Sequence, residues 1–207
     1  MSQYLVNPYY FSVQKRLFDI FFALLGLIIL VPIFILAYPL FTFFLGRPFF
    51  FKQKRMGKNK KHFVLYKIRT MKIGSENQQD ELRNVSSAPY PMFKVKNDPR
   101  FISIGKLFSN FGVDELPQLL NILKNDMSFV GPRPLPINEA IQLPSSWDFR
   151  YAVRPGILSK WALAPNRYDS LRTWKKLEKE TLKSGSLTKD IKLIIKAIAQ
   201  IIFKISP

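Results

Sequence analysis

The hydrophobic residues are unevenly spread along the chain, and the longest apolar run lies near its N-terminus. Residues 17–45 are almost all apolar and include a single charged residue, Asp19. A helix of about 20 apolar residues is long enough to cross the hydrocarbon core of a bilayer. The run is too long for the hydrophobic part of a cleaved signal peptide, and no small-residue cleavage site follows it. The pattern therefore predicts a membrane anchor.

Basic residues flank this run on both sides. Lys15 and Arg16 precede it, and it is followed by Arg47, Lys52, Lys54 and Arg55. Such residues mark the cytoplasmic side of membrane proteins, and a straight span cannot place both ends there. Pro32, near the middle of the run, lacks the N–H that a continuous helix uses. We therefore predict a helix–break–helix that enters one leaflet and returns, with the break at Pro32. A single kinked span is the alternative.

Two shorter patterns predict further elements. Residues 62–68 alternate as a short β-strand does, and Lys67 and Arg69 would then project to the same side. Near the C-terminus, isoleucines recur at helical spacing while the lysines fall mostly elsewhere. This is typical of a basic amphipathic helix that lies in a membrane interface, and a helix packed on the core is the alternative. The apolar face comprises Ile191, Ile195, Ile198, Ile202 and Ile205.

The candidate chemistry lies in the middle of the chain, where two carboxylates stand side by side. Asp114 and Glu115 precede a proline and an apolar run with helical spacing, which predicts a helix that begins there. Adjacent carboxylates are hard oxygen ligands that suit Mg²⁺. The alternative is that the pair only caps the helix. The same dipeptide, Asp80–Glu81, recurs in a polar loop predicted for residues 74–92, and there it carries no functional signal.

Two arginines held by prolines are candidate phosphate ligands. Arg133 lies between Pro132 and Pro134, a rigid mount for a planar group that can bind phosphate through two donors. Arg154 directly precedes Pro155 and Gly156 and is mounted in a similar way.

The composition narrows the choice of partners. In 207 residues there are 32 Lys and Arg against 14 Asp and Glu, which gives a formal net charge of +18. We therefore expect an anionic partner: nucleic acid, an anionic membrane or a phosphorylated substrate. The absence of cysteine excludes a disulfide framework and a Cys-ligated zinc. The single histidine, His62, makes a histidine-based metal site improbable, and we expect it at the surface.

Three segments carry a resemblance to a known family: FKVKNDPR (residues 93–100), DELPQLLNILKNDMS (114–128) and VGPRP (130–134). In this order and spacing they resemble the bacterial sugar transferases that act on polyprenyl phosphate. These are the monotopic phosphoglycosyl transferases, also called undecaprenyl-phosphate sugar phosphotransferases. Residues 51–71 and 154–162 resemble the same family. The resemblance implies an α+β, mainly helical fold: a monotopic membrane protein with a re-entrant helix broken at a proline and a small cytoplasmic catalytic domain.

The resemblance also implies an activity. Sugar-1-phosphate would pass from a nucleotide-diphosphate sugar, such as a UDP-sugar, to polyprenyl (undecaprenyl) phosphate at the cytoplasmic face of the bacterial inner membrane. Asp114 would be the nucleophile that forms a covalent phospho-sugar intermediate, and Glu115 would be a ligand of Mg²⁺. The residues expected near substrate phosphates are Lys67, Arg69, Arg133 and Arg154.

The sequence departs from the family's pattern at two places. Residues 109–112 lack a basic residue that relatives commonly carry before the Asp-Glu pair. Residues 159–166 contain one extra residue and lack a glutamine. Both departures bear on phosphate contacts and substrate preference. Glu178 stands where relatives tend to have Asp and is a further candidate.

The patterns together predict three parts: an anchor at residues 1–50, a catalytic domain at 51–187 and an interface helix at 188–207. The alternative to an enzyme is a membrane-tethered protein that uses its charge to hold anionic lipid or nucleic acid. That alternative accounts for the charge and the anchor but not for the carboxylate pair and Arg133. The chain also lacks the aromatic and basic interleaving of single-strand binders outside its anchor, so we expect no nucleic-acid partner. The patterns do not specify the sugar or the oligomeric state.

Overall fold

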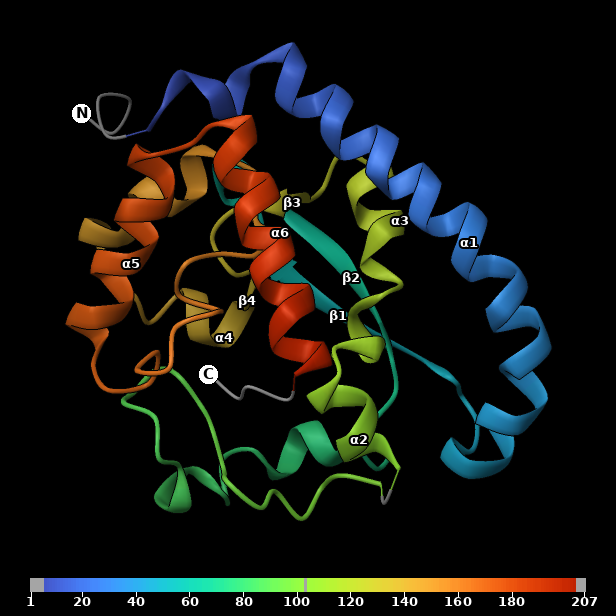
Figure 1. The fold of residues 1–207 in the computed structure, drawn as a ribbon. Helices are drawn as coiled ribbons and strands as arrows, with labels where there is room; N and C mark the ends of the chain where they lie inside the picture. Colours follow the sequence, from blue (N-terminus) through green and yellow to red (C-terminus); the bar gives the residue numbers. More distant parts are fainter. Residues whose placement is uncertain (1–5, 103, 204–207) are drawn as a thin grey trace.

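Two small sheets with helices packed around them make up the fold (Figure 1). The structure, a computed structural model, describes residues 6–102 and 104–203. The α-helices are α1 (Val13–Leu45), α2 (Gly105–Asn110), α3 (Gln118–Leu123), α4 (Ile137–Ala140), α5 (Leu171–Lys183) and α6 (Leu187–Ile202). The strands are β1 (Phe50–Met56), β2 (His62–Ile68), β3 (Ser128–Val130), β4 (Leu135–Pro136) and β5 (Gly156–Leu158). The expected mixture of helix and sheet is confirmed.

The first sheet is built on a hairpin that follows α1. Strands β1 and β2 pair antiparallel, with Phe50 opposite Ile68 and Met56 opposite His62. The predicted strand at residues 62–68 is therefore confirmed, and His62 is exposed as expected. Strand β4 pairs with the other edge of β1, so the order is β2-β1-β4. This arrangement places the segment after β3 beside the hairpin.

The second sheet contains the two strands β3 and β5, paired in parallel. Gly131 and Gly156 let the two chains approach closely, because a Cβ on Gly156 would lie 2.1 Å from the backbone nitrogen of Gly131. The two proline-held arginine segments, VGPRP and VRPG, therefore run next to each other. A side chain at either glycine would force them apart.

Helix α1 is one continuous helix. The prediction that the helix is interrupted at Pro32 is therefore wrong. Both Pro32 and Pro39 lie inside the helix. A proline removes one hydrogen bond and kinks a helix more readily than it ends one. Figure 1 shows α1 running along the outside of the molecule and curving round in its second half. The helix thus changes direction without stopping.

Both halves of α1 pack on the rest of the molecule through one side only. The first half places Ala23 and Leu27 against Leu119 and Ile122 of α3. The second half buries Leu45 in another cluster, with Phe49 and Ile68. Its remaining surface is apolar and open: the most apolar 18 consecutive residues within Val13–Leu36 have a mean hydropathy of 2.8, and 11% of them are buried. Of the helices that the structure describes, this is the one long and apolar enough to cross a membrane.

Helix α6 also exposes an apolar face. The side chains of Ile191, Ile195, Ile198 and Ile202 are 39–66% exposed. This exposure contradicts the alternative that the helix packs on the core and agrees with an interface helix. Ile205, which belongs to the predicted face, lies outside the described residues.

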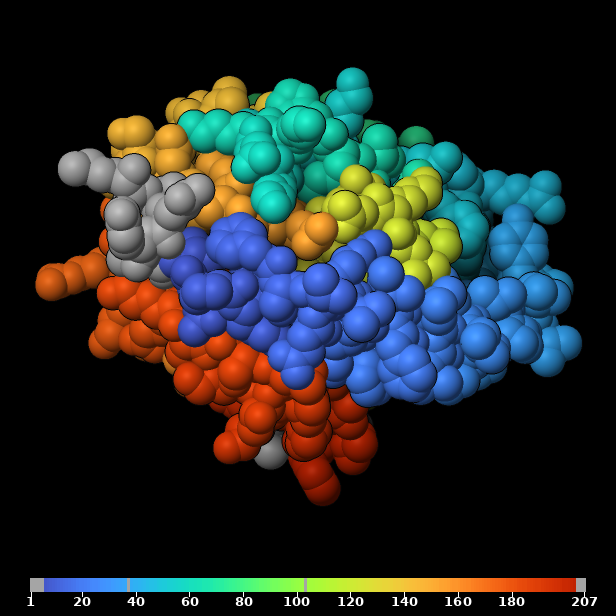
Figure 2. Space-filling view, turned by 90° about the horizontal axis from the view of Figure 1, so that it is seen from above, coloured from blue at the N-terminus to red at the C-terminus, as the bar shows by residue number. Residues whose placement is uncertain are grey.

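A buried ion cluster joins α1 to α6. Lys15 Nζ lies 2.8 Å from Asp19 Oδ1 and 2.8 Å from Asp190 Oδ2. Ser128 Oγ donates to the same oxygen of Asp19 at 3.1 Å. Asp19 thus pairs with Lys15, whereas Arg16 turns away to the end of α3. The N-terminal ends of the two apolar helices are thereby held together, and Figure 2 shows the blue and red segments meeting there.

Candidate active site

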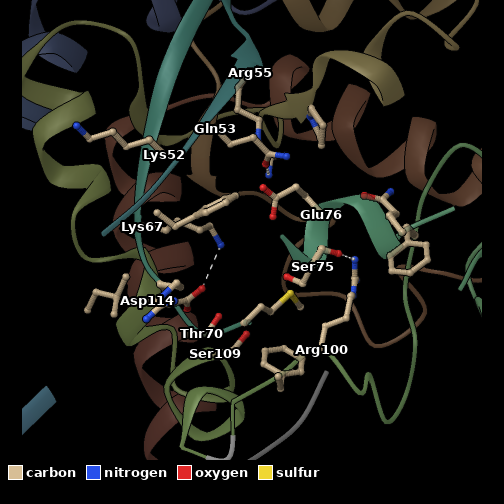
Figure 3. Close-up of a pocket in the computed structure, with 18 of the residues that line it drawn as sticks. Lys52, Gln53, Arg55, Lys67, Thr70, Ser75, Glu76, Arg100, Ser109 and Asp114 are labelled. Carbon is tan, nitrogen blue, oxygen red and sulfur yellow. Dashed lines mark hydrogen bonds and ion pairs between the residues drawn. The ribbon is translucent and has the colours of Figure 1, made fainter. Parts of the chain in front are cut away.

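A cavity of about 700 Å³ opens between the first sheet and the loops that follow it. Strands β1 and β2 form one wall, and the 3₁₀ turn Ser75–Gln78 faces them across the cavity in Figure 3. Phe93, Trp161 and Tyr168 add aromatic surface. The cavity therefore has a polar wall and an aromatic rim, which suits a polar ligand that also carries a planar group.

Asp114 and Glu115 lie in a 3₁₀ turn, Val113–Glu115, directly before α3. Pro117 serves as the N-cap of α3, and no side chain caps this helix. Neither carboxylate accepts a hydrogen bond from a backbone N–H in the part of the chain that the structure describes. The capping alternative is therefore wrong. Asp114 is buried, with 4% of its surface exposed, and it lines the cavity.

Lys67 holds both carboxylates together. It projects from β2 toward Asp114, as Figure 3 shows. Its Nζ lies 3.2 Å from Asp114 Oδ2 and 2.9 Å from Glu115 Oε1. Arg133 approaches from the other side, with Nη1 at 3.8 Å from Glu115 Oε1. The sequence therefore identified three of the partners that the fold brings together around Asp114.

The two carboxylates respond differently to this environment. Burial raises the pKa of Asp114, and the neighbouring charge of Glu115 raises it further, against the opposing effect of Lys67. Burial would also raise the pKa of Glu115, but Lys67 and Arg133 together outweigh it and lower that pKa to about 2. Glu115 is thus a firmly ionised carboxylate, whereas Asp114 is the more basic of the two.

Arg133 is positioned through its backbone as well as its prolines. Arg150 Nη2 donates to the carbonyl oxygen of Arg133 at 2.7 Å and to Glu178 Oε1 at 3.0 Å. Trp174 Nε1 donates to the same oxygen of Glu178 at 2.9 Å. The guanidinium group of Arg133 lies 6.0 Å from the ring centroid of Trp161. The arginine is held at both its backbone and its side chain.

Glu178 is therefore a supporting residue and does not line the cavity. It is fully buried beneath the arginine segment. Burial raises its pKa, although Arg150 and the hydrogen bond from Trp174 oppose this. Its place as a candidate site residue is corrected to one that holds Arg133 and Trp174 in position.

Arg69 reaches the cavity wall but also contacts the anchor. It lines the cavity, and its Nη2 donates to the carbonyl oxygen of Leu45, the last residue of α1. Gly46 follows with a positive φ of 69°, and a Cβ there would lie 3.2 Å from Arg69 Nη2. Arg69 thus connects the end of the apolar helix to the site.

Arg154 is not brought to this cavity. The pairing of β5 with β3 turns its side chain toward the far end of α3, where Nε donates to the carbonyl oxygen of Asn125 at 3.2 Å. The expectation that it contacts the same phosphates as Arg133 is therefore wrong. A Pro-Gly neighbour predicts a rigid backbone but not the direction of the side chain.

Several cavity residues were missed in the sequence. Arg55 donates to the carbonyl oxygen of Pro134 at 3.0 Å, and burial followed by the charge of Arg133 lowers its pKa to about 9. Glu139 also faces the cavity; burial raises its pKa, and it accepts one hydrogen bond from Gln79 Nε2 at 3.3 Å. The signal for Arg55 was present, because it lies within the segment 51–71 that carries the family resemblance. Glu139 gave no signal.

The departures from the family's pattern border this cavity. Ser109 and Trp161 both line it, and they come from segments 109–112 and 159–166. A serine in place of a basic residue removes a positive charge from this wall. The remaining cations that line the cavity near Asp114 include Lys67, Arg133 and Arg55.

The carboxylate pair fits a magnesium ion whose remaining ligands are waters and substrate phosphates. Within the described residues no three metal-ligating side chains gather. Mg²⁺ commonly uses one or two carboxylates together with waters and substrate phosphates. The contacts to Lys67 and Arg133 use Asp114 Oδ2 and Glu115 Oε1. The second oxygen of each carboxylate makes no hydrogen bond within the described residues and is suited to a ligand.

Comparison with known proteins shows the family to which the chain is similar. The family model described as bacterial sugar transferase matches residues 10–204. The chain is 32% identical over 191 residues to the exopolysaccharide production protein ExoY of Sinorhizobium fredii, covering 90% of this chain and 84% of that protein. It is 33% identical over 186 residues to the undecaprenyl-phosphate galactose phosphotransferase of Salmonella typhimurium, covering 88% and 39% of the two chains.

A shorter match is closer in sequence. The putative undecaprenyl-phosphate N-acetylgalactosaminyl 1-phosphate transferase of Bacillus subtilis is 42% identical over 120 residues, or 58% of this chain and 61% of that protein. The galactosyl transferase CpsE of Streptococcus agalactiae is 34% identical over 184 residues, covering 88% of this chain and 41% of that protein. The chain thus spans most of ExoY but about two fifths of CpsE and of the Salmonella protein.

Proposed function

Because the chain belongs to the bacterial sugar transferase family, we propose that it transfers sugar-1-phosphate from a nucleotide-diphosphate sugar, of the UDP-sugar class, to undecaprenyl phosphate. The nucleoside monophosphate is the second product. One observation carries this proposal: Asp114, buried at the wall of a large cavity, lies beside Lys67 and next to an ionised Glu115 that also faces Arg133. A cavity of this volume admits a nucleotide sugar.

In the first step, an oxygen of Asp114 attacks the phosphorus that carries the sugar. A new bond forms between this phosphorus and the Asp114 oxygen. The bond from the same phosphorus to the bridging oxygen breaks, and the electron pair leaves on the nucleoside monophosphate. The raised pKa of Asp114 makes its ionised carboxylate more nucleophilic than an ordinary Asp. Lys67 and Arg133 stabilise the negative charge that develops on the phosphate oxygens.

In the second step, a phosphate oxygen of undecaprenyl phosphate attacks the same phosphorus. The bond to Asp114 breaks, the carboxylate is regenerated, and the sugar is released as a lipid diphosphate. Pro48, Phe50 and Phe51 line the cavity directly after the end of α1. An acceptor held by its hydrocarbon chain along α1 would therefore present its phosphate to this side of the cavity.

Glu115 is the residue we assign to Mg²⁺, with the second oxygen of Asp114 beside it. Bound there, the ion would neutralise diphosphate oxygens and so favour attack by an anionic carboxylate. Lys67 contacts both carboxylates and so keeps them side by side, Asp114 for attack on phosphorus and Glu115 for binding Mg²⁺.

The exposed apolar surfaces of α1 and α6 support a reaction at the membrane surface. We assign α1 to a re-entrant anchor that bends within one leaflet and α6 to the interface beside it. The basic residues at both ends of the anchor favour the cytoplasmic face of the bacterial inner membrane. Both substrates are then accessible: the donor from the cytoplasm and the acceptor from the bilayer.

The proposal is tested with the full chain purified in neutral detergent. The protein is incubated with undecaprenyl phosphate and a panel of UDP-sugars, and release of UMP is measured for each. ADP- and GDP-sugars serve as nucleotide controls, and the Asp114→Asn variant serves as the enzyme control. We expect UMP release with at least one UDP-sugar that requires both the acceptor and Asp114. Failure of every donor to release a monophosphate above the Asp114→Asn background would refute the proposal.

A further inference from the structure

Arg154 lies with two other cations on a face of the molecule away from the cavity. It meets Arg16 of α1 at the C-terminal end of α3. Arg16 donates through Nη1 to the carbonyl oxygen of Ile122 at 2.8 Å and through Nη2 to that of Leu123 at 3.1 Å. Arg154 donates to the carbonyl oxygen of Asn125 at 3.2 Å. Two guanidinium groups from distant parts of the chain therefore gather within one turn of backbone.

Lys58 completes the group from the β1–β2 hairpin. It belongs to the 3₁₀ turn Lys58–Lys60, and its Nζ lies 5.4 Å from the ring centroid of Phe11. Burial and the nearby charge of Arg154 both lower the pKa of Lys58. The start of α1, the hairpin and α3 meet on the face seen in Figure 2. We call Arg16, Lys58 and Arg154 the entry cluster.

No carboxylate forms an ion pair with the entry cluster in the described part of the chain. Burial and the charge of Arg154 lower the pKa of Arg16, and the charge of Asp19 offsets them only in part. Within the described residues, none of its three members lies within 4.0 Å of an acidic oxygen. Lys60, in the same turn as Lys58, shows the contrast, because its Nζ lies 2.8 Å from Asp148 Oδ2. Half-buried cations that lie close together without an ion-pair partner destabilise one another. The arrangement therefore favours an anionic ligand.

Capping of α3 explains only part of the arrangement. The carbonyl oxygens at the end of the helix account for the two donors of Arg16 and for Nε of Arg154. They do not account for Lys58, which donates no hydrogen bond within the described residues. The two Nη groups of Arg154 likewise make no hydrogen bond there. These donors are available to a ligand.

The surroundings of the entry cluster are apolar and exposed. Phe11, Val13 and Leu17 are 51%, 73% and 61% exposed, and they lie at the start of the helix that carries Arg16. Cations at one end of an exposed apolar helix match the boundary between headgroups and acyl chains. A ligand here would need a negative headgroup and a hydrocarbon part in the same molecule.

We propose that the entry cluster binds the phosphate of an anionic phospholipid in the leaflet that α1 enters. The phosphate lies among Arg16, Lys58 and Arg154, and the acyl chains follow the apolar side chains of the first turns of α1. This site lies at the opposite end of α3 from Asp114, so it is separate from the cavity. It assigns Arg154 to phosphate binding, but of a membrane lipid and not of the sugar donor.

The test measures lipid binding and does not depend on transferase activity. The full chain in neutral detergent is titrated with short-chain phosphatidylglycerol, and binding is followed by native mass spectrometry and by the rise in melting temperature. Short-chain phosphatidylcholine, inorganic phosphate and undecaprenyl phosphate form the other arms. Lys58→Gln is the main variant because Lys58 makes no hydrogen bond that folding requires, and Lys60→Gln is its matched control. Arg154→Gln is the second variant.

We expect phosphatidylglycerol to bind the wild-type chain more tightly than phosphatidylcholine or inorganic phosphate. A cation near a membrane surface contributes about 1 kcal/mol, so Lys58→Gln and Arg154→Gln should each weaken binding about fivefold. Lys60→Gln should leave the affinity unchanged. Equal losses in Lys58→Gln and Lys60→Gln would mean general charge attraction and would overturn the site. Displacement of phosphatidylglycerol by an equal amount of undecaprenyl phosphate would instead assign the cluster to the acceptor and overturn the phospholipid assignment.

Discussion

At the scale of single residues, Asp114 and Glu115 share one lysine but respond to it differently. Glu115 is ionised well below neutral pH because Lys67 and Arg133 outweigh its burial. Asp114 has only Lys67 within ion-pair distance in the described part of the chain and keeps a raised pKa. A raised carboxyl pKa means that the ionised form costs folding free energy, whereas a lowered one means that ionisation stabilises the fold. Neutralising Glu115 should therefore destabilise the fold, whereas neutralising Asp114 should not.

The first prediction uses this difference. Asp114→Asn should abolish turnover and leave the melting temperature equal or higher at neutral pH, because the costly charge is removed. Glu115→Gln should lower stability by roughly 2–3 kcal/mol at neutral pH, because folding lowers the pKa of Glu115 from 4.5 to about 2. The ionised carboxylate therefore stabilises the fold above pH 4.5, and this contribution is lost as the pH falls toward 2. Turnover in Glu115→Gln should recover partly at higher Mg²⁺. Melting curves and kcat on the same preparations check both.

The control for this pair is the same dipeptide elsewhere in the chain. Asp80 and Glu81 are exposed, as expected, and do not line the cavity. Asp80→Asn should change neither stability nor turnover. A stabilising effect of Glu115→Gln would contradict the account of the pair, and so would near-normal turnover in Asp114→Asn.

The second prediction concerns Arg133, whose side chain is 38% exposed at the cavity. A charge-assisted contact to phosphate contributes roughly 1.5–3 kcal/mol, which is about one to two powers of ten in kcat/KM. Arg133→Ala should lose that factor. Arg133→Lys keeps the charge but not the two-donor geometry and should recover part of it. A destabilised Arg133→Ala with normal kcat/KM for its folded fraction would mean that Arg133 only packs.

At the scale of elements, the sequence predicted periodic segments well and side-chain directions poorly. The strand at residues 62–68 and the exposed isoleucine face of α6 followed from spacing alone. Pro32 lies inside α1 without ending it, because a helix packed along one side tolerates one missing hydrogen bond. The direction of Arg154 could not be predicted, since it depends on how β5 pairs with β3, a contact between residues distant in the sequence.

The third prediction tests how buried elements support the cavity. Glu178 on α5 accepts a hydrogen bond from Arg150, which also donates to the carbonyl oxygen of Arg133. Glu178→Leu removes the acceptor that Arg150 and Trp174 share, leaves the buried guanidinium group of Arg150 without a partner and should cost about 3–5 kcal/mol of stability. The double change Arg150→Met with Glu178→Leu removes both charges and should restore much of that stability. The kcat/KM of this double variant should be lower than that of the wild type, because the carbonyl group of Arg133 lacks the hydrogen bond that Arg150 donates.

The matched control for the third prediction is Glu180→Gln on the same helix. Glu180 is 42% exposed and pairs with Lys160 at 3.6 Å. Exposed pairs contribute little, so stability and kinetics should both stay near the wild-type values. Full activity in the folded double variant would mean that Glu178 and Arg150 serve the core alone.

At the scale of the whole molecule, charge and apolar surface together support the proposed position in one leaflet. The net charge of +18 is combined with two exposed apolar helices that a buried ion cluster fixes together. The basic residues at both ends of α1 and the bend between them favour re-entry over a full crossing.

The fourth prediction tests that topology. The chain has no cysteine, so single cysteines introduced at Gln14 and Lys61, both exposed, are the only thiols. An impermeant thiol reagent added to intact cells should label neither, and permeabilised cells should show both labelled. Labelling of Gln14→Cys alone in intact cells would establish a full span and exclude the re-entrant anchor.

The central claim is that Asp114 carries the sugar phosphate between donor and acceptor, and trapping that intermediate tests it most directly. The wild-type chain is mixed with the UDP-sugar that supports turnover, without undecaprenyl phosphate, and intact mass and UMP are measured together. We predict one UMP per active site and a covalent sugar-phosphate adduct on Asp114, which disappears when undecaprenyl phosphate is added. Asp114→Asn should form no adduct. Turnover with both substrates but neither UMP nor adduct in the absence of acceptor would mean direct transfer, and would contradict the account.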